Sequence, residues 1–584
     1  MTPFDVNIAH TLRQRAIEQP YQEAVIVPSG RDRAGRVTYA HLTYAQLDAL
    51  SEQVARGLLS HGITPGMHTA FMVKPSIEFF VLTFALFKAR AVPVLIDPGI
   101  GIRNIRRCLA EAEAEAFVGI PAAHLARVLF RWRGAGWKKL VSISKGRGWG
   151  RITYHDLLEA GAQAGAPHAT RARVDEVAAI LFTSGSTGAP KGAVYTHGNF
   201  QAQVRLLAQS LHIKPGERDL CTFPLFALFA PALGMSAVIP EMDFTRPAQV
   251  DPEKIREAIE NFGISNMFGS PALIRRVAEY GNLQGWRFPS LKRVISAGAP
   301  VPATVIASFR QLIEDDCLFV TPYGATESLP VAIAESRLIL DETRHDTAHG
   351  RGICVGHPVP ETDVRILRIT DHALPRLHQD DLLRPGHIGE IIVSGHQVTH
   401  RYFNREEATQ AGKILGTEGQ NLFHRMGDLG YFDEQGRLWF CGRKSQRVIT
   451  REGDMYTINC EGVFNQHPGV ARTALVGMGQ APEQIPALCV ELKKVIRDPA
   501  ERDQLLKDLR AIALRFPHTK SIEHFFIHAG FPVDIRHNAK IFREKLKPWA
   551  EAQWQKGSWS PAAAASWDRP SSDNSSSAAI ASKP

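Results

Sequence analysis

The sequence feature that most constrains this chain is an apolar run followed at once by a short loop of serine, threonine and glycine. The apolar run covers residues 177–182, and the loop reads Thr183-Ser184-Gly185-Ser186-Thr187-Gly188 before it reaches Lys191. We interpret the apolar run as a buried strand. Glycines let the backbone approach a ligand closely, and successive N–H groups can form a nest for an anion. Together with the charge of Lys191, the segment predicts a polyphosphate site.

Two other interpretations of this loop were weighed. A Walker A loop places its lysine directly after a glycine and before serine or threonine. Here Lys191 follows Ala189-Pro190 and precedes Gly192, so a P-loop NTPase does not fit. A flexible surface loop is the simpler alternative, but surface loops rarely alternate hydroxyls and glycines directly after a buried strand.

The loop closely resembles the phosphate loop of the acyl-adenylate-forming superfamily, which includes acyl-CoA synthetases, peptide-synthetase adenylation domains and luciferases. The resemblance covers nearly all of residues 10–550, and the motifs follow the family's order. It implies ATP and Mg²⁺ as cofactors. It also implies an N-terminal adenylate-forming domain at residues 1–443 and a small, mobile α+β lid domain at 444–550.

The patterns along the chain agree with that division. The 584 residues are too many for one hydrophobic core. Helical and strand patterns alternate over residues 7–118, which predicts an α/β fold with helices flanking the sheets. Short strand patterns between 364 and 431 predict a β-rich subdomain. Residues 551–584 are rich in Ala, Ser and Pro, and we expect them to be disordered.

Further motifs resemble the family's nucleotide site. The segment Thr321-Pro322-Tyr323-Gly324-Ala325-Thr326-Glu327, interpreted as a loop after a strand, matches the motif Y-G-x-T-E. The resemblance implies that Tyr323 stacks on adenine, Thr326 holds a phosphate oxygen and Glu327 binds Mg²⁺ through oxygen. Small residues resemble the loop that shapes the adenine pocket: Ala297, Gly298, Ala299 and Pro300.

The motif His424-Arg425-Met426-Gly427-Asp428 resembles the ribose site, and Arg443 resembles the arginine that contacts ribose and phosphate. The family's hinge then lies at Lys444 or Ser445, where Ser445 replaces the usual Asp or Lys. Lys540 resembles the catalytic lysine that neutralises charge as the carboxylate attacks the α-phosphate. The expected catalytic residues are thus Lys540, Lys191, Thr183 and Glu327.

The stretch 222–240 is mostly apolar and carries no charge. It is barely long enough to span a bilayer, and prolines interrupt it, so we interpret it as a buried segment that lines an apolar pocket. The predicted pocket residues are Phe226, Ala227, Phe229, Leu233 and Gly234. Many family members carry His or an aromatic residue where Ala227 stands. The small side chain would make room for an acid branched near its carboxylate.

The resemblance implies an enzyme that converts ATP and a hydrophobic carboxylic acid into an acyl-adenylate and pyrophosphate, after which a second nucleophile releases AMP. Residues 224–229, 323–330, 342–346 and 352–356 look like the β-lactone synthetases of bacterial long-chain olefin biosynthesis. There the acid is a 2-alkyl-3-hydroxy acid, whose own hydroxyl closes the ring. A long-chain acyl-CoA synthetase shares every nucleotide motif and stays open. The presence of Lys191, Glu327, Asp428 and Lys540 disfavours a non-catalytic binding module.

Charge and cysteine content bear on location and partners. The net charge is +9, and no nucleic-acid motif is visible. The basic run 127–139 could contact a membrane surface, at most peripherally, or an acidic partner, but a solvated helix end and loop is the simpler interpretation. The seven dispersed cysteines fit reduced thiols, and no signal peptide is visible at the start, so we expect a cytoplasmic protein. The resemblance also allows a complex with other enzymes of the olefin pathway.

Overall fold

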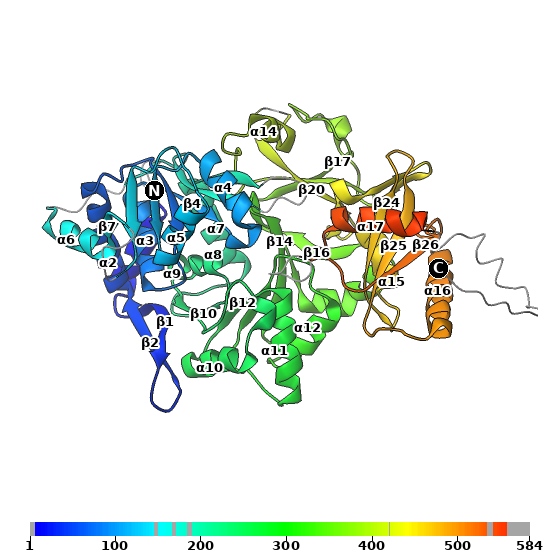
Figure 1. Cartoon of the computed structure of the whole chain (residues 1–584), viewed down its shortest axis with the longest axis horizontal. Helices are drawn as coiled ribbons and strands as arrows, with labels where there is room; N and C mark the ends of the chain where they lie inside the picture. Colours follow the sequence, from blue (N-terminus) through cyan, green and yellow to red (C-terminus); the bar gives the residue numbers. More distant parts are fainter. Residues whose placement is uncertain are drawn as a thin grey trace, which may run out of the picture. The chain divides into compact units, whose positions relative to one another are not determined.

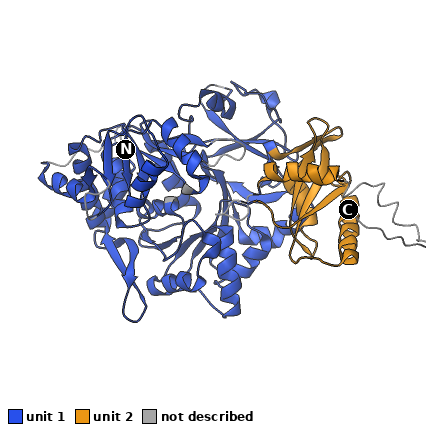
Figure 2. Cartoon of the chain, viewed as in Figure 1, with its two compact units in different colours: residues 1–445, 533–541 blue, residues 446–532, 542–584 orange. Residues whose placement is uncertain are grey.

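The computed structural model describes residues 6–144, 150–165, 171–183, 190–417, 419, 421–533 and 541–556. The chain forms two compact units: residues 1–445 with 533–541, and residues 446–532 with 542–584 (Figure 2). The division follows Ser445, whereas the domain boundary expected from the sequence follows residue 443. The predicted loop residues 184–189, Lys540 and the tail from 557 lie outside the described residues.

Unit 1 contains a mostly parallel sheet that ends at the predicted phosphate loop. Among the described residues it has seven strands in the order β7-β6-β5-β3-β4-β8-β9. Only β8 and β9 pair antiparallel, with Thr183 opposite Lys191. The strands are β3 (His68–Met72), β4 (Val92–Ile96), β5 (Ala116–Gly119), β6 (Lys139–Ser142), β7 (Ile152–Thr153), β8 (Val177–Thr183) and β9 (Lys191–Thr196).

A second sheet of unit 1 comprises fourteen strands within the described residues. Thirteen follow the order β17-β18-β20-β21-β16-β15-β14-β13-β12-β10-β11-β1-β2, and β19 pairs with β20. The part from β14 to β1 is parallel. Its strands are β1 (Glu23–Arg31), β10 (Arg218–Cys221), β11 (Ser236–Val238), β12 (Asn266–Gly269), β13 (Arg293–Ser296) and β14 (Leu318–Ala325). Strand β2 (Val37–Thr43) pairs antiparallel with β1 at the edge of the sheet.

The remaining strands of this sheet pair antiparallel, which confirms the predicted β-rich region. They are β15 (Ser328–Glu335), β16 (Ile353–Pro358), β17 (Asp363–Leu367), β18 (Gly389–Ser394), β19 (Lys413–Leu415), β20 (Leu422–Phe432) and β21 (Leu438–Arg443).

Helix α3 (Ile77–Lys88) joins the cores of the two sheets, because it contacts both β1 and β4. Ser76 caps its start by accepting a hydrogen bond from the amide of Phe79, and its side chains from Phe79 to Lys88 are all buried. A helix that is apolar on every side is stable only when it is covered all round. This helix belongs to the alternating helix and strand patterns that the sequence predicted over residues 7–118.

Other helices cover the sheets of unit 1 (Figure 1). They are α1 (Ala9–Glu18), α2 (Tyr44–Ser60), α4 (Ile102–Glu111), α5 (Pro121–Leu129), α6 (Tyr154–Gln163), α7 (His197–Ser210), α8 (Pro224–Ala227), α9 (Phe229–Leu233), α10 (Pro252–Phe262), α11 (Pro271–Leu283), α12 (Ala303–Arg310), α13 (Arg344–Ala348) and α14 (Glu406–Gly412). The predicted α/β class, with helices flanking the sheets, is confirmed.

Unit 2 is a small α+β body with a core of its own. Strands β24 (Val470–Met478), β25 (Ile485–Leu492) and β26 (His524–His528) form one sheet, and β22 (Val448–Thr450) pairs with β23 (Gly453–Met455). Helices α15 (Thr457–Phe464), α16 (Pro499–Leu514) and α17 (Arg543–Gln555) complete it. Because α17 continues to Gln555, residues 551–555 are helical, and the expectation of disorder from residue 551 is wrong for them.

The apolar stretch 222–240 is not one long helix. It contains α8, α9 and β11, and residues 230–240 are buried. Among the described residues, no helix has the length and apolar character that crossing a membrane requires.

Candidate active site

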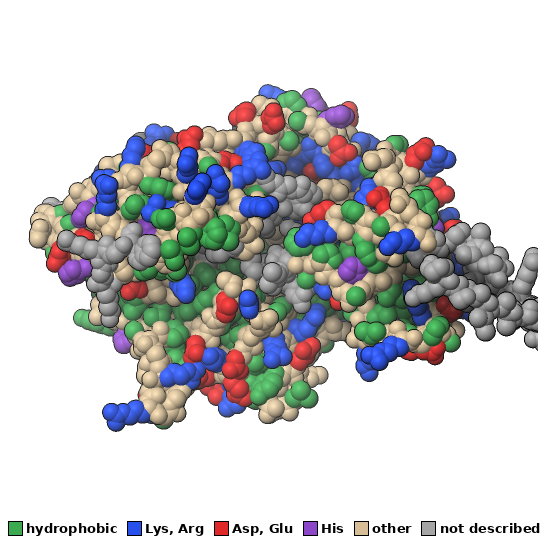
Figure 3. Space-filling view, viewed as in Figure 1, with side chains coloured by type: hydrophobic (Ala, Val, Ile, Leu, Met, Phe, Trp, Pro, Cys, Tyr) green, Lys and Arg blue, Asp and Glu red, His purple; other side chains and the backbone are tan. Residues whose placement is uncertain are grey.

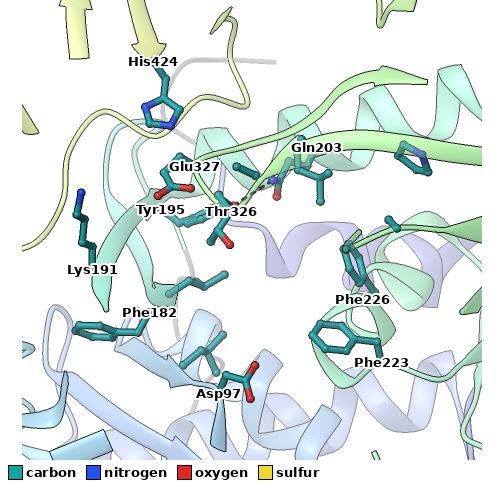
Figure 4. Close-up of a pocket in the computed structure, with 18 of the residues that line it drawn as sticks. Asp97, Phe182, Lys191, Tyr195, Gln203, Phe223, Phe226, Thr326, Glu327 and His424 are labelled. Carbon is teal, nitrogen blue, oxygen red and sulfur yellow. Dashed lines mark hydrogen bonds between the residues drawn. The ribbon is translucent and has the colours of Figure 1, made fainter. Parts of the chain in front are cut away.

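A cavity of about 830 Å³ lies within unit 1 (Figure 4). One side, which we call the charged end, presents Lys191, Glu327 and His424. Phe223 and Phe226 lie on the other side, which we call the apolar end. Further aromatic rings in the lining are Phe84, Phe87, Phe200, Phe229, Phe244 and Phe268. The cavity therefore suits a molecule with an ionic part and a long apolar part.

The tip of the β14–β15 hairpin supplies two side chains of the charged end, Thr326 and Glu327. The sequence predicted a loop after a strand over residues 321–327, which is wrong for residues 321–325: β14 continues to Ala325, residues 326–327 form the turn, and β15 begins at Ser328. Gly324 permits this tight turn, since a Cβ atom there would lie 2.7 Å from the Ser328 carbonyl oxygen. The hydroxyl of Tyr195, on β9, donates a hydrogen bond to the Thr326 carbonyl.

Glu327 is held at both its backbone and its side chain. Its carbonyl oxygen accepts a hydrogen bond from the Thr399 amide at 2.9 Å, and its Oε1 accepts one from the Tyr402 hydroxyl at 2.7 Å. In the described part of the chain, no cluster of three or more His, Cys, Asp or Glu side chains could hold a metal. Mg²⁺ often binds through one or two carboxylates together with substrate phosphates and water. A single oriented carboxylate on the cavity wall fits that mode.

Cationic groups surround this carboxylate. Lys191 Nζ lies 5.1 Å from the centre of the Tyr402 ring. Burial lowers the pKa of Lys413 to about 7, although the nearby Glu327 carboxylate opposes the shift. Burial, and next the charge of Lys413, hold the pKa of His424 well below its usual value, so this imidazole is neutral. The charged end thus combines a carboxylate, which can bind a metal ion, with the ammonium group of Lys191, which can bind a phosphate group.

Asp428 lies in β20, directly opposite Arg443 of β21. The Tyr323 hydroxyl donates to its Oδ2 at 2.7 Å, and Arg443 Nη1 lies 3.0 Å from its Oδ1. Burial raises the pKa of Asp428, whereas Arg443 and the Tyr323 hydrogen bond lower it. A carboxylate has about four acceptor sites, so Asp428 can still accept further hydrogen bonds.

Tyr323 is placed differently from the expectation that it stacks on a base. Its ring packs against a buried cluster that includes Val331 and Leu438, and Tyr323 is not part of the cavity lining. Its hydroxyl instead orients Asp428. Of the predicted adenine loop, Ala297 and Gly298 line the cavity, whereas Ala299 and Pro300 do not.

The predicted hinge residues lie at the end of unit 1. Lys444 Nζ donates hydrogen bonds to Glu390 Oε2 at 3.0 Å and to the Thr370 carbonyl at 2.9 Å. Arg425 pairs with the same Glu390 carboxylate, which is 1 % exposed. Ser445 lines the cavity and is the last residue before the chain enters unit 2.

Two of the five predicted pocket residues, Phe226 and Phe229, line the cavity. Ala227 and Leu233 are instead buried in the hydrophobic core and do not form part of the lining. Gly234 is the left-handed C-cap of α9 at φ +84°, where a Cβ atom would lie 3.1 Å from Arg15 and Pro215. Ala227 and Leu233 therefore pack into the core, and Gly234 ends α9. None of these three residues belongs to the cavity lining in which the sequence analysis placed them.

The polar lining residues that were not identified from the sequence include Tyr195, Gln203 and Tyr402. A signal existed for Gln203, because it falls four residues after Asn199 and three before Leu206, on the buried side of α7. Tyr195 and Tyr402 carried no comparable signal, since each acts on the distant hairpin 326–327.

Several predicted site residues cannot be placed. Thr183 ends β8, but Ser184, Gly185, Ser186, Thr187, Gly188 and Lys540 lie outside the described residues. Their roles stay predictions.

Comparison with known proteins places the chain among related sequences and folds. The family model described as "AMP-binding enzyme" matches residues 12–403. An olefin beta-lactone synthetase of Stenotrophomonas maltophilia is 50% identical over 556 residues, covering 94% of this chain and 99% of the relative. One from Xanthomonas campestris is 50% identical over 551 residues, covering 94% and 98%.

Among solved structures, amide bond synthetase McbA from Marinactinospora thermotolerans has a TM-score of 0.74 at 22% identity, with 93% of this chain and 99% of that chain covered. O-succinylbenzoate coenzyme A synthetase from Bacillus subtilis, in complex with ATP and magnesium ion, has a TM-score of 0.70 at 21% identity, with 92% and 99% covered. These likenesses establish the fold, and the family match together with the two close relatives shows that the chain belongs to the AMP-binding enzyme family.

Proposed function

We propose that the chain is a β-lactone synthetase. In the first step, a carboxylate oxygen of a hydrophobic 2-alkyl-3-hydroxy acid attacks the α-phosphorus of ATP, and pyrophosphate leaves. In the second step, the 3-hydroxyl oxygen attacks the acyl carbon of the adenylate, and the bond between that carbon and the AMP oxygen breaks. The products are a β-lactone, AMP and pyrophosphate, and no atom is oxidised or reduced.

The observation that carries this proposal is the 50% identity to two olefin beta-lactone synthetases over nearly the whole of both chains. The shape of the cavity supports it, because an ionic end and an aromatic end meet in one space of about 830 Å³. That space suits a lipid-like acid whose carboxylate must reach a phosphate group.

We assign the charged end to the triphosphate. Lys191 would neutralise phosphate oxygens, and Glu327, oriented by Tyr402, would hold Mg²⁺. When bound, Mg²⁺ supplies positive charge that stabilises the phosphate oxygens. Asp428 would accept hydrogen bonds from the ribose, with Tyr323 and Arg443 fixing its two oxygens.

The remaining nucleotide contacts are assigned through the family resemblance. We propose that the loop residues 183–188 hold the phosphates and that Ala297 and Gly298 border the adenine. Lys540 would stabilise the charge that develops as the carboxylate attacks. Lys444 or Ser445 would be the hinge about which the lid domain moves between the two catalytic steps.

The apolar end would bind the alkyl chains and orient the acid. Because the substrate carries its own nucleophile, the enzyme has only to hold the hydroxyl oxygen near the acyl carbon, at roughly 3–3.5 Å. No separate thiol substrate is needed for the release of AMP. This separates the proposed reaction from that of a long-chain acyl-CoA synthetase, which would use the same adenylation step.

The decisive experiment incubates the purified protein with ATP, Mg²⁺ and a 2-alkyl-3-hydroxy acid, with and without CoA. We expect the β-lactone at full rate without CoA, measured by mass spectrometry. The matched acid without the 3-hydroxyl should be adenylated but should not turn over. A thioester from that plain acid, with no lactone from the hydroxy acid, would replace the proposal by the acyl-CoA synthetase.

We also propose that the protein works in the cytoplasm. All seven cysteines are buried and form no disulfide bonds, which supports a reducing compartment. Thiol titration of protein from cells fractionated without reductant tests this, because free thiols in the cytoplasmic fraction are expected.

For partners, we propose at most peripheral contact with a membrane and a complex with other enzymes of the olefin pathway. Apolar side chains are exposed on and just after α5, at Leu125, Val128, Leu129 and Phe130. Figure 3 shows hydrophobic and basic side chains close together on the visible face. Sedimentation with anionic vesicles and co-purification with the pathway's other enzymes would test the two interactions separately.

A further inference from the structure

Gln203 lies on the wall of the cavity at a fixed position. Helix α7 begins with a capping box, in which Thr196 and Asn199 satisfy each other's backbone amides. The Asn199 side chain also donates to the carbonyls of His396 and Val398, at 2.9 and 3.1 Å. Gln203 follows one turn later on the same face of the helix and is 2 % exposed. The helix start therefore determines where this side chain lies.

The hydrogen bonds of Tyr195 determine which way the Gln203 amide points. The Tyr195 hydroxyl donates its single hydrogen to the Thr326 carbonyl, so it can only accept from Gln203. Gln203 Nε2 donates to it at 3.3 Å, and Figure 4 shows this bond beside Thr326. The amide oxygen, Oε1, is thereby directed away from Tyr195.

Gln203 Oε1 has no hydrogen-bond partner among the described residues. Other buried polar side-chain atoms in that part of the chain also lack one, but Gln203 is the single residue of that group that lines the cavity. Buried polar atoms are nearly always paired, so an unpaired one on a residue that lines a cavity is a candidate acceptor for a bound ligand once that side chain turns toward it.

The chemistry around this oxygen restricts the ligand group. An amide oxygen needs a hydrogen-bond donor, which excludes ionised phosphate and carboxylate oxygens because they only accept. The lining residues next to Gln203 on α7, Phe200 and Val204, are apolar. A hydroxyl on an otherwise apolar molecule meets both conditions, and an alcohol of the acid substrate is such a group.

We propose that Gln203 Oε1 accepts a hydrogen bond from the 3-hydroxyl of the acid and holds that hydroxyl for ring closure. This proposal rests on the proposed function and names the residue by which the site distinguishes hydroxy acids from plain fatty acids. As an amide, Gln203 orients the hydroxyl and does not remove its proton. During ring closure the new C–O bond forms, the bond to the AMP oxygen breaks, and a phosphate oxygen of the departing AMP takes the proton.

The test compares Gln203→Met with the wild type on two acids, the 2-alkyl-3-hydroxy acid and the same acid without the 3-hydroxyl. Methionine keeps the length of the side chain and removes the acceptor. In single-turnover reactions we expect the second-order rate constant for pyrophosphate release from the hydroxy acid to fall about tenfold, with less than a twofold change for the plain acid. Lactone formation should fall at least as much. An equal loss for both acids, or no loss, would overturn the proposal.

Gln201→Met is the matched control, because it places the same substitution on the same helix at a residue that does not line the cavity. Gln201 donates to the Val6 carbonyl at 3.1 Å, and its variant should retain the preference for the hydroxy acid. A loss of preference in this variant would show a general effect of the helix and contradict the proposal.

A substrate series on the wild type keeps the proposal testable if Gln203→Met does not fold. The 3-methoxy acid has an oxygen but no hydrogen to donate, so it should react about as poorly as the plain acid. Equal rates for the 3-hydroxy and 3-methoxy acids would contradict a donated hydrogen bond. Failure of the proposed function appears separately, as absence of lactone from the wild type, because pyrophosphate release reports the acid preference in either case.

Discussion

The two ends of the cavity are built in different ways. At the charged end, Glu327 is held by a hydrogen bond from Tyr402, and Asp428, which is buried behind the cavity lining, is held in the same way by Tyr323. At the apolar end, aromatic rings pack on one another, as in the pair Phe226 and Phe268, whose ring centres lie 4.5 Å apart. The charged end is held by hydrogen bonds, whose strength depends on direction. The apolar end is held by packing, which depends on the shape and contact area of the rings.

This difference predicts how each end responds to substitution. Loss of a partner at the charged end leaves a buried polar group unsatisfied, and the effect should fall on nucleotide binding or on adenylation. A change of volume at the apolar end should alter the choice of acid and leave nucleotide affinity unchanged. The following experiments test that separation, from the largest expected effect to the smallest.

Lys540→Ala should have the largest effect, on the rate of adenylate formation. Loss of one group that stabilises the developing charge typically slows a reaction by about 10²–10³. We expect that decrease in pyrophosphate release, with ATP affinity largely unchanged. Lys556→Ala, at an exposed residue just after α17, is the matched control and should be unaffected. Normal pyrophosphate release from Lys540→Ala would remove this residue from the catalytic set.

Asp428→Ala should weaken ATP and AMP by the same factor, since both contain the ribose. Loss of two charge-assisted hydrogen bonds costs about 3 kcal/mol, or about 10² in affinity. Calorimetry with each nucleotide measures this, and Asp380→Ala, at an exposed residue, is the control. Unchanged nucleotide affinity in Asp428→Ala would exclude the ribose assignment.

Ala232→Leu tests the apolar end. Ala232 lies on α9, is 4 % exposed and lines the cavity. A leucine there would fill part of the space in which we propose that the acid binds. We expect kcat/KM for the long-chain acid to fall about tenfold, with a smaller loss for a shorter acid. ATP affinity, measured on the same preparation, should stay constant. A parallel loss of ATP affinity would show that the two ends are not separable.

Tyr323→Phe should have the smallest effect and a distinct pH dependence. The Tyr323 hydrogen bond lowers the pKa of Asp428, so its removal should raise that pKa further. The ribose needs the ionised carboxylate, and AMP binding is therefore lost as the pH falls through this pKa. In the variant, the loss should begin at a higher pH, with a cost of about 1 kcal/mol above that range. Identical pH profiles of AMP affinity would contradict the orienting role of Tyr323.

The comparison also explains which parts of the site were visible in the sequence. Lys191, Glu327 and Asp428 were all identified from short motifs, because phosphate, metal and ribose each require particular functional groups in a short stretch. The partners that orient them, Tyr195 and Tyr402, belong to strands and loops remote in sequence from the hairpin at 326–327. No local pattern records such a pairing.

The apolar end was predicted less well for a related reason. The uncharged stretch 222–240 correctly indicated burial, but burial is compatible with either the core or a cavity wall. Phe226 faces the cavity, whereas Ala227 beside it faces the core, and only the packing of α8 decides between them. Hydrophobic side chains are interchangeable enough that their sequence does not reveal which surface they cover.

By itself, the sequence determined the α/β fold class and the family, and it predicted the chemistry: a phosphate loop after a strand, a carboxylate for Mg²⁺ and a carboxylate for ribose. The tertiary structure alone decided the geometry: the hairpin that presents Thr326 and Glu327, the position of Gln203 and the wall of the apolar end. The physical reason is that chemical function depends on the kind of group, which is a local property. Orientation and cavity shape depend on contacts between segments far apart in the chain.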